Sequence, residues 1–552
     1  MENDEPAAIM TSRKGFLSAS ALAAGSLLTP NELLAAGQPN ATESAALPRR
    51  KRAYAIREDA ARAHFAAGVP RNVSNGDERR YADKLASFSK TLPHNDLGEV
   101  EPADFATFVA IVERGAPAGF NEMPRDSQAV ERLNNPQAMY AYDFVAADSH
   151  ATHIIPAPAF ASARMAVEMG ELYWLALTLD VPFAQFDTNP LIAAAAADLN
   201  SFSEPLEEGH PKAIAPMTLF RSVFAGAARG PFVSQFLWLD VPYGPTKLSQ
   251  RYPVPVPGQA FLTEAEAWLA CQRGAAARET IVYAEPRWVA TNSDLAAYVH
   301  RDFSFQAYMH AALIALSYGA QALSPTNPYR VSKTQFGDIT FGNKMFLSMI
   351  AEAALIAQKT SYFHKWLVDR RLRPEVTGGR IQYQAAGRKE YGLHPDIFRS
   401  DALARTKSLH GSSFLPVAYP EGSPTHPSYP AAHACNAGAS ATLLKAFFNQ
   451  DFVIPNAVVA SADGTALVPW REGELTLGGE FEKLAVNIAF SRHAAGVHYR
   501  SDSLTGLLAG EVQALLLLGD YSRTFNEQFD GFVLTTFGGQ KVRIQNGAVS
   551  TS

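Results

Sequence analysis

Five side chains in the last third of the chain are of the types that can surround a small tetrahedral oxyanion. Lys365 and Arg373 lie in the segment KWLVDRRLRPE, His433 lies in SYPAAHACNAGA, and Arg492 and His498 lie in SRHAAGVHYRSD. Three fixed positive charges can neutralise the equatorial oxygens of such an anion, one imidazole can bond its central atom, and the other can move a proton on the far side. The sequence therefore predicts one oxyanion site built from three separate segments.

The first segment places two cations eight residues apart, which on one helix would separate their side chains by about 80°. Arg373 precedes Pro374, which disfavours helical backbone at the arginine, so its side chain can turn toward the space that Lys365 faces. A solvated basic helix face is the alternative for this pair taken alone.

His433 stands at the start of an expected helix, directly after Pro430-Ala431-Ala432. Backbone N–H groups at a helix N-terminus attract anions. Taken alone, a histidine here is more typical of a helix cap or a buried core residue, and the other two segments are what favour a site.

The third segment has Arg492 and His498 six residues apart, with Gly496 between them and Asp502 four residues after the histidine. Glycine permits the close backbone approach that a bound anion needs. Asp502 can hold the second ring nitrogen of His498 and fix its tautomer, which makes it a supporting residue. The alternative is an ordinary turn between two helices with a surface ion pair.

The composition is that of a globular protein of 552 residues, with 47% hydrophobic and 18% charged residues. The net charge of −6 and the absence of a clustered basic excess argue against nucleic acid as a partner. Two cysteines, Cys271 and Cys435, are too few for a disulfide framework or a thiolate metal cage.

The N-terminus has the pattern of a targeting segment, because SRKGFLSASALAAGSLL joins a basic pair to an apolar run too short to span a membrane. It is similar to a twin-arginine signal, with Lys14 in place of the second arginine, and Met10 is an alternative start. We expect an export signal at 1–37, a polar linker at 38–50 and a periplasmic or extracellular location. No later segment is apolar enough to span a bilayer.

Helical periodicity dominates the rest of the chain, and it predicts an all-α helical bundle with long loops over one end of the core, as one domain over 51–545. The helices are expected at 159–183, 297–323, 344–372 (closed by Pro374) and 431–448, with two more in 481–521 that meet near 496–502. Loops are expected at 240–258, 373–395 and 410–430, and a small hairpin is expected around Gly538-Gly539.

The same segments resemble the vanadium-dependent haloperoxidases, a family related to the type 2 phosphatidic acid phosphatases. The likeness is to algal-type bromoperoxidases and includes HKWLVDRRLRPE, YPEGSPTHPSYPAAHA, KLAVNIAFSRHAAGVHYRSD and the closing FDGFVLTTFGG, over about residues 50–545. The resemblance implies that Lys365, Arg373 and Arg492 bind vanadate oxygens, that His498 bonds vanadium, and that His433 is the acid–base residue. It also implies that Lys365 polarises the bound peroxide, and it places His426 near the halide, which favours bromide over chloride.

One departure from the family pattern concerns the segment Pro-Ser-Gly-His, which reads Pro430-Ala431-Ala432-His433 here. The backbone N–H at Ala432 survives, but the serine hydroxyl is missing at Ala431. Losing one hydrogen bond to a charged group costs about 1.5–3 kcal/mol, or roughly ten- to hundredfold in affinity. Two alternatives therefore remain open: a phosphatase that uses the same pocket, and a weakened or inactive oxyanion-binding relative.

The resemblance further implies partners and a quaternary state. Hydrogen peroxide, bromide and small organic acceptors are the expected substrates, with no nucleic acid, no membrane and a homo-oligomeric assembly. A structural calcium ion occurs in some members; the candidate loop is 335–342 (QFGDITFG), for which an ordinary turn is the alternative.

Overall fold

The computed structural model describes residues 41–207 and 213–551. The chain divides into two compact units, Met1–Ala66 and Ala67–Ser552. The expected export signal at 1–37 lies outside the described residues. From residue 41 onward the expected linker at 38–50 is helical, as part of α3 (Ala41–Ala67). Alanine, glutamate and arginine fill this segment, and their helix propensity outweighs its polarity.

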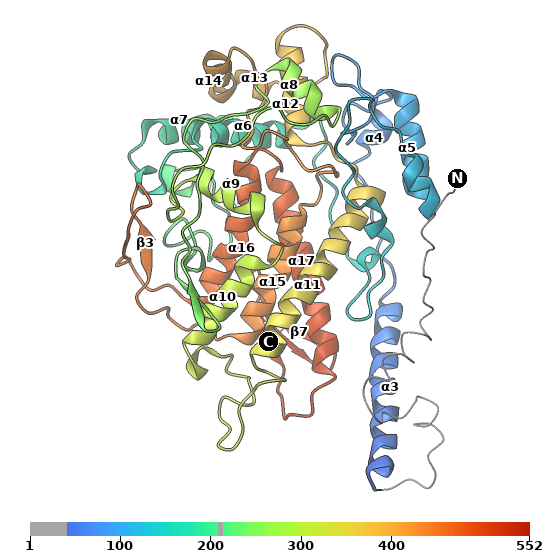
Figure 1. Cartoon of the computed structure of the whole chain (residues 1–552), viewed down its shortest axis with the longest axis vertical. Helices are drawn as coiled ribbons and strands as arrows, with labels where there is room; N and C mark the ends of the chain where they lie inside the picture. Colours follow the sequence, from blue (N-terminus) through green and yellow to red (C-terminus); the bar gives the residue numbers. More distant parts are fainter. Residues whose placement is uncertain (1–40, 208–212, 552) are drawn as a thin grey trace, which may run out of the picture. The chain divides into compact units, whose positions relative to one another are not determined.

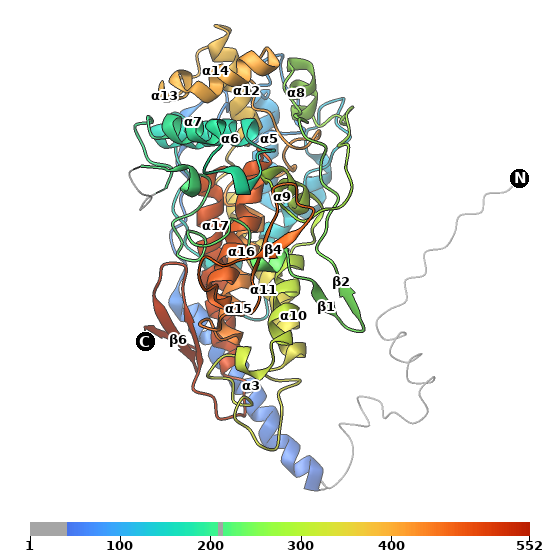
Figure 2. The ribbon, with the colours of Figure 1, turned by 90° about the vertical axis from the view of Figure 1, so that its left-hand side faces the viewer.

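The second unit is built around a bundle of long helices, which run side by side in both Figure 1 and Figure 2. α15 lies at its centre and packs against α11, α16 and α17. The bundle consists of α9 (Asn292–Arg301), α10 (Gln306–Ser317), α11 (Asn343–Phe363), α15 (Ala432–Phe447), α16 (Leu477–Ala494) and α17 (Arg500–Ser522).

Small residues bring α15 and α17 into close contact. A Cβ added to Gly510 of α17 would lie 1.9 Å from the carbonyl oxygen of Cys435, and one added to Gly438 of α15 would lie 1.9 Å from that of Leu507. Only glycine tolerates this approach of two backbones. The crossing places the first turn of α15 beside the first turn of α17, where His433 and Asp502 lie.

Shorter helices cover one end of the bundle, at the top of Figure 1. They are α6 (Ala163–Leu177), α7 (Pro190–Leu199), α8 (Ala265–Gln272), α12 (Pro374–Ala385), α13 (Asp396–Arg399) and α14 (Asp401–His410), while α4 (Asp77–Arg80) and α5 (Pro102–Arg114) belong to the preceding part of the unit. Short 3₁₀ turns are η1 (Pro117–Glu122), η2 (Pro136–Tyr140), η3 (Ser149–Ala151), η4 (Phe183–Gln185), η5 (Pro216–Thr218), η6 (Gln235–Leu237) and η7 (Ala320–Ala322).

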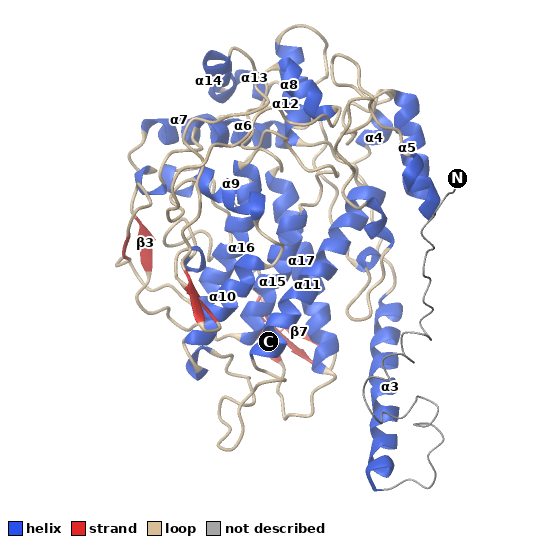
Figure 3. Ribbon diagram, viewed as in Figure 1, coloured by secondary structure: helices blue, strands red, loops and turns tan. Residues whose placement is uncertain are grey.

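Strands are few and short, and loops fill much of the remaining surface (Figure 3). β1 (Val241–Tyr243) pairs with β2 (Thr246–Leu248), and β3 (Val458–Ala460) pairs with β4 (Leu467–Pro469). β5 (Phe532–Thr535), β6 (Lys541–Gln545) and β7 (Ala548–Thr551) form an antiparallel sheet, so the C-terminal hairpin gains a third strand. The helical bundle with long loops is confirmed. No helix in the described ranges combines the length and apolar character that crossing a bilayer requires.

Three of the expected boundaries were wrong, and each has a physical cause. The helix expected at 297–323 is interrupted between α9 and α10, where Asp302 leaves helical geometry. The helix expected at 344–372 ends in a π-helical turn, η8 (His364–Val368), and an extended segment follows. Pro374 begins α12 rather than ending a helix, which is the position where proline's missing N–H costs nothing; the loop expected at 373–395 therefore contains a helix.

Candidate active site

Arg373 connects the parts of the site. Its backbone is extended (φ −86°, ψ 157°), as the following proline predicts, and its side chain is fully buried. The guanidinium donates to the carbonyl oxygens of Val497 (2.7 Å) and His426 (2.9 Å), to Nε2 of His498 (2.9 Å) and to Nδ1 of His426 (3.0 Å). Arg373 thus binds the imidazoles of His498 and His426 and the carbonyl oxygens of Val497 and His426.

These contacts determine where the protons lie on the two imidazoles. Because a guanidinium only donates, Nε2 of His498 and Nδ1 of His426 must both accept. Nδ1 of His498 donates to Asp502 at 2.8 Å, as the sequence predicted. Burial, and then Arg373 and Lys365, hold the pKa of His498 well below its usual value. His498 is therefore neutral and presents the lone pair of Nε2 to the cations.

Lys365 lies in the π-helical turn η8 and is fully buried. π-turns occur frequently at functional sites. Its Nζ donates to the carbonyl oxygens of Pro427 and Ser428, each at 2.7 Å. Burial and the nearby charges of Arg373 and Arg492 lower the pKa of Lys365 well below its usual value, so the three cations share one neighbourhood.

Arg492 comes from the last turn of α16 and is 4% exposed. One of its terminal nitrogens donates to the carbonyl oxygen of Val299 (3.0 Å) and lies 3.4 Å from the hydroxyl of Tyr419. Its Nε is buried and finds no acceptor among the described residues. Leaving a buried cationic donor without an acceptor costs free energy, which an exogenous anion would recover.

His433 is the second residue of α15, after the N-cap Ala431 and the first helical residue Ala432. The N–H of Ala432 is among those that have no intrahelical acceptor. The His433 side chain is 28% exposed, and its Nε2 lies 3.1 Å from a carboxylate oxygen of buried Asp302. The charge of His433 also acts on His498. His433 is thus the member of the set that solvent can reach.

His426 lies in the segment that connects α14 to α15, which contains no helix or strand. Its imidazole is buried and lies 5.5 Å from the ring of Tyr362. Burial, and then Lys365 and Arg373, hold its pKa well below the usual value. Arg373 therefore links His426 to the cation cluster.

Sequence reasoning missed four residues that build the site. Arg371 donates to Asp502 at 2.7 Å, and Ser428 also donates to that carboxylate. Asp302, at the end of α9, pairs with His433. Lys90 donates to the carbonyl oxygens of Glu421 (2.8 Å) and Ser423 (2.6 Å) and anchors the segment that carries His426. Only Arg371 had a local signal, because it stands two residues before Arg373 and shares its face in an extended chain.

The arrangement has an excess of positive charge. Lys365, Arg373 and Arg492 donate to carbonyl oxygens, a hydroxyl and imidazoles, and no carboxylate of the described residues lies within ion-pair distance of any of them. The nearby carboxylate of Asp502 is already paired with Arg371 and His498. The residues fit a vanadate oxyanion, which can accept from the three cations and from Ala432 N–H. The lone pair of His498 Nε2 accepts from Arg373 here and would turn to the vanadium once that guanidinium donates to a vanadate oxygen.

The candidate calcium loop shows a different arrangement. The carboxylate oxygens of Asp338 lie 2.5 Å from Nζ of Lys344. Across residues 41–207 and 213–551, no three His, Cys, Asp or Glu side chains gather in a way that could hold a metal ion. The prediction of a calcium ion stays a prediction.

Comparison with known proteins identifies the class. The family model described as the VCPO second helical-bundle domain matches residues 396–527. The chain is 32% identical over 517 residues to the vanadium-dependent bromoperoxidase of Ascophyllum nodosum, covering 89% of this chain and 92% of that protein, and 31% identical over 591 residues to that of Corallina officinalis, covering 90% and 98%.

The fold agrees with this result. The homohexameric structure of the second vanadate-dependent bromoperoxidase from Ascophyllum nodosum superposes with a TM-score of 0.86 at 26% identity, covering 95% of this chain and 98% of that one. This chain belongs to the vanadium-dependent haloperoxidases, and the relatives that span its length are bromoperoxidases.

Proposed function

We propose that this chain is a vanadium-dependent bromoperoxidase, which oxidises bromide with hydrogen peroxide to hypobromous acid and so halogenates small organic compounds. The observation that carries the proposal is the buried cluster of Lys365, Arg373 and Arg492, whose charges meet carbonyl oxygens and imidazoles instead of carboxylates. The identity of 31–32% to bromoperoxidases over about nine-tenths of the chain supports it.

Vanadate supplies a Lewis acid that activates peroxide without a change of oxidation state. Lys365, Arg373, Arg492 and the N–H of Ala432 would hold its oxygens. His498 would bond vanadium through Nε2, since Asp502 keeps the proton on Nδ1. A positive shell in a buried site stabilises negative charge far more strongly than the same groups would in water.

Proton transfer falls to His433, because it is the imidazole of the set that solvent reaches. Asp302 orients its ring from the end of α9, as a carboxylate does for a general base. Lys365 would donate to an oxygen of the peroxide substrate and stabilise negative charge there. His426 accepts from Arg373 through Nδ1, so its Nε2–H would be the donor to the halide beside the cluster.

Monochlorodimedone bromination by vanadate-loaded protein tests the proposal. We expect turnover that requires vanadate, hydrogen peroxide and bromide together. Hydrolysis of a phosphate ester by vanadate-free protein, with no bromination after loading, would instead identify a phosphatase.

The Ala431→Ser variant addresses the missing hydroxyl. We expect a roughly tenfold tighter hold on vanadate, the lower end of what one hydrogen bond to a charged group contributes. Ala434→Ser, one turn further into α15 and away from the anion, serves as the matched control. A silent wild type that gains large activity with Ala431→Ser would identify a decayed enzyme.

We further propose a homo-oligomer, supported by the homohexameric relative from Ascophyllum nodosum. Multi-angle light scattering of the purified chain tests this, and a monomer at micromolar concentration would contradict it. Export remains a proposal from the sequence of residues 1–37, which fractionation of expressing cells would test.

A further inference from the structure

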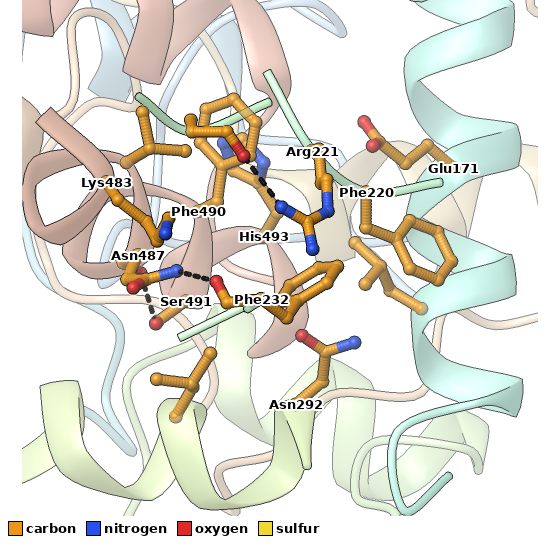
Figure 4. Close-up of a pocket in the computed structure, with 14 residues that line it drawn as sticks. Glu171, Phe220, Arg221, Phe232, Asn292, Lys483, Asn487, Phe490, Ser491 and His493 are labelled. Carbon is orange, nitrogen blue, oxygen red and sulfur yellow. Dashed lines mark hydrogen bonds between the residues drawn. The ribbon is translucent and has the colours of Figure 1, made fainter. Parts of the chain in front are cut away.

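A cavity lies on the face of α16 opposite to Arg492 (Figure 4). Lys483, Asn487 and Phe490 line it from one face of α16 at helical spacing, while Arg492 projects elsewhere. The remaining walls come from α6, α9 and the segment 220–232. Nothing in the proposed peroxidase reaction uses this cavity.

Two buried donors in this cavity have no acceptor. Arg221 is 6% exposed and Asn292 is 4% exposed, and in Figure 4 they lie on opposite sides of the Phe232 ring. The terminal nitrogens of Arg221 donate to the carbonyl oxygens of Ala227 (2.9 Å) and Gly230 (3.0 Å). Its Nε, and Nδ2 of Asn292, have no hydrogen-bond partner within the described part of the chain.

The carboxylates near the cavity are committed to other cations. Glu171 lines the cavity, but both of its oxygens bond the guanidinium of Arg500, at 2.5 and 3.0 Å. Glu480 bonds Lys483 at 2.5 Å. No carboxylate oxygen of residues 41–207 or 213–551 lies within ion-pair distance of Arg221. Burial accordingly lowers the pKa of Arg221 to about 10, with Glu480 acting in the opposite direction.

The walls favour one kind of acceptor. The Arg221 guanidinium stacks on the ring of Phe232 at 4.9 Å, and Phe220 and Phe490 complete an aromatic lining. Aromatic ring edges carry partial positive charge and do not hydrogen-bond strongly to water. A weakly hydrated anion accepts hydrogen bonds from several donors and requires no acceptor. A water molecule in the same place also has hydrogens to donate and therefore requires acceptors.

We propose that this cavity binds one weakly hydrated monovalent anion of the halide class, held between Nε of Arg221 and Nδ2 of Asn292. Such an anion would tie the segment 220–232 to the first turn of α9 and to α16. The site is distinct from the vanadate site, because different faces of α16 serve the two. Binding of the anion would raise the stability of the folded protein and leave the rate of turnover unchanged.

Crystals of the full chain grown in sodium bromide test the position directly. Anomalous scattering at the bromine absorption edge should show a peak between Arg221 and Asn292, in vanadate-free and vanadate-loaded protein alike. Electron density for a water molecule there, with no anomalous signal, would overturn the proposal. Since this experiment needs no catalysis, its result is separate from the outcome of the bromination assay.

Thermal unfolding tests the energetics, with sodium bromide compared to sodium gluconate at equal ionic strength. Asn292→Leu removes a donor group that bonds no other residue of the described chain, so the fold should persist. We expect its bromide affinity at this site to fall about tenfold or more, and the bromide-dependent rise in Tm to shrink accordingly.

The neighbouring Ser293→Ala is the matched control, because Ser293 does not line the cavity, and it should keep the full rise in Tm. Bromination kcat should stay within about twofold of wild type in both variants. An equal rise in Tm for wild type, Asn292→Leu and Ser293→Ala would place the bromide effect elsewhere and refute this site.

Discussion

Arg371 and Arg373 are two residues apart and both are buried, but the groups that surround their charges differ. Arg371 bonds the carboxylates of Asp502 (2.7 Å) and Glu168 (3.3 Å), and these anions raise its pKa. Arg373 bonds carbonyl oxygens and imidazoles, and burial lowers its pKa to about 10. Depth in the protein therefore does not mark the binding group. What separates these two arginines is whether the fold supplies a carboxylate as counter-charge.

The largest expected effect comes from removing each guanidinium in turn. Arg371→Met leaves Asp502 and Glu168 buried without their cation, so the free energy of unfolding should fall by about 3–5 kcal/mol. Arg373→Met removes a charge that had no ionic partner, so it should cost less stability in oxyanion-free buffer. It should nevertheless weaken vanadate binding by about a hundredfold or more.

Urea unfolding and vanadate titration of both variants measure these two effects. Arg380→Met is a suitable control, because Arg380 is also buried and bonds the carbonyl oxygens of Leu97 and Gly98, away from the site. The contrast between the two arginines would be wrong if Arg371→Met and Arg373→Met lost equal stability and retained equal vanadate affinity.

The second-largest expected effect concerns Asp502, the carboxylate that Arg371 binds. Asp502→Asn no longer fixes the proton on Nδ1 of His498, so vanadate affinity should fall by about 10–100-fold. Asp369→Asn is the matched control, since Asp369 is a buried acid nearby whose pKa is raised to about 6 and which accepts from Ala157 N–H. Isothermal titration with vanadate measures the affinity of both variants. An unchanged vanadate affinity in Asp502→Asn would show that Asp502 does not support His498.

A smaller effect concerns pH and buried histidines outside the vanadate site. Burial lowers the pKa of His310 and of His364 to about 4. A lowered folded-state pKa means that the unfolded chain binds more protons below about 6.5, so stability is present above that pH and is lost as pH falls toward about 4. Each group contributes up to about 1.4 kcal/mol per pH unit in this window.

Urea unfolding at several pH values, in buffer without oxyanions, measures this slope. His310→Asn should reduce the slope by up to about 1.4 kcal/mol per pH unit, which corresponds to one proton. A His310→Asn variant with the wild-type slope would contradict the assignment.

The smallest expected effect concerns Lys90, which anchors the segment carrying His426. Lys90→Met leaves the carbonyl oxygens of Glu421 and Ser423 without their donor, and it removes the cation that lies 4.0 Å from the buried carboxylate of Glu375. We expect the KM for bromide to rise about two- to tenfold, which corresponds to one or two ordinary hydrogen bonds, with vanadate affinity unchanged. Lys84→Met is the control, because Lys84 bonds the carbonyl oxygen of Glu78. A change in vanadate affinity instead of KM would show that Lys90 acts on the cation cluster.

Much of the bundle was predictable because its helices carry their own local signals. The junction of α16 and α17 was expected near Gly496, and the pairing of Asp502 with His498 followed from their spacing of four residues and the first turn of α17. Arg373 was predicted to leave helical geometry because proline acts on the residue before it. Each of these signals operates over a few residues.

The wrong and missing predictions involve long-range contacts. Lys365 and Arg373 do not share a helix, because the apolar pattern of 344–372 continues through a π-turn and an extended segment that the strand-like bridge between Ser87 and Arg371 stabilises. Asp302 and Lys90 meet the site only through tertiary packing, and no sequence spacing reports such a contact. The amino-acid type alone does not tell whether a buried arginine meets carboxylates or carbonyls.

The short stretch from Arg371, which forms a strand-like bridge, to the extended Arg373 has a consequence for how sequences of this family can diverge. Residues two apart in extended chain lie on one side, about 6.6 Å from each other, so Arg371 reaches the carboxylate end and Arg373 the imidazole end of the Asp502–His498 pair. Inserting or deleting one residue between the two arginines would turn one of them to the opposite side. Length variation should therefore be tolerated in the surface loops of this fold and rejected in this short stretch.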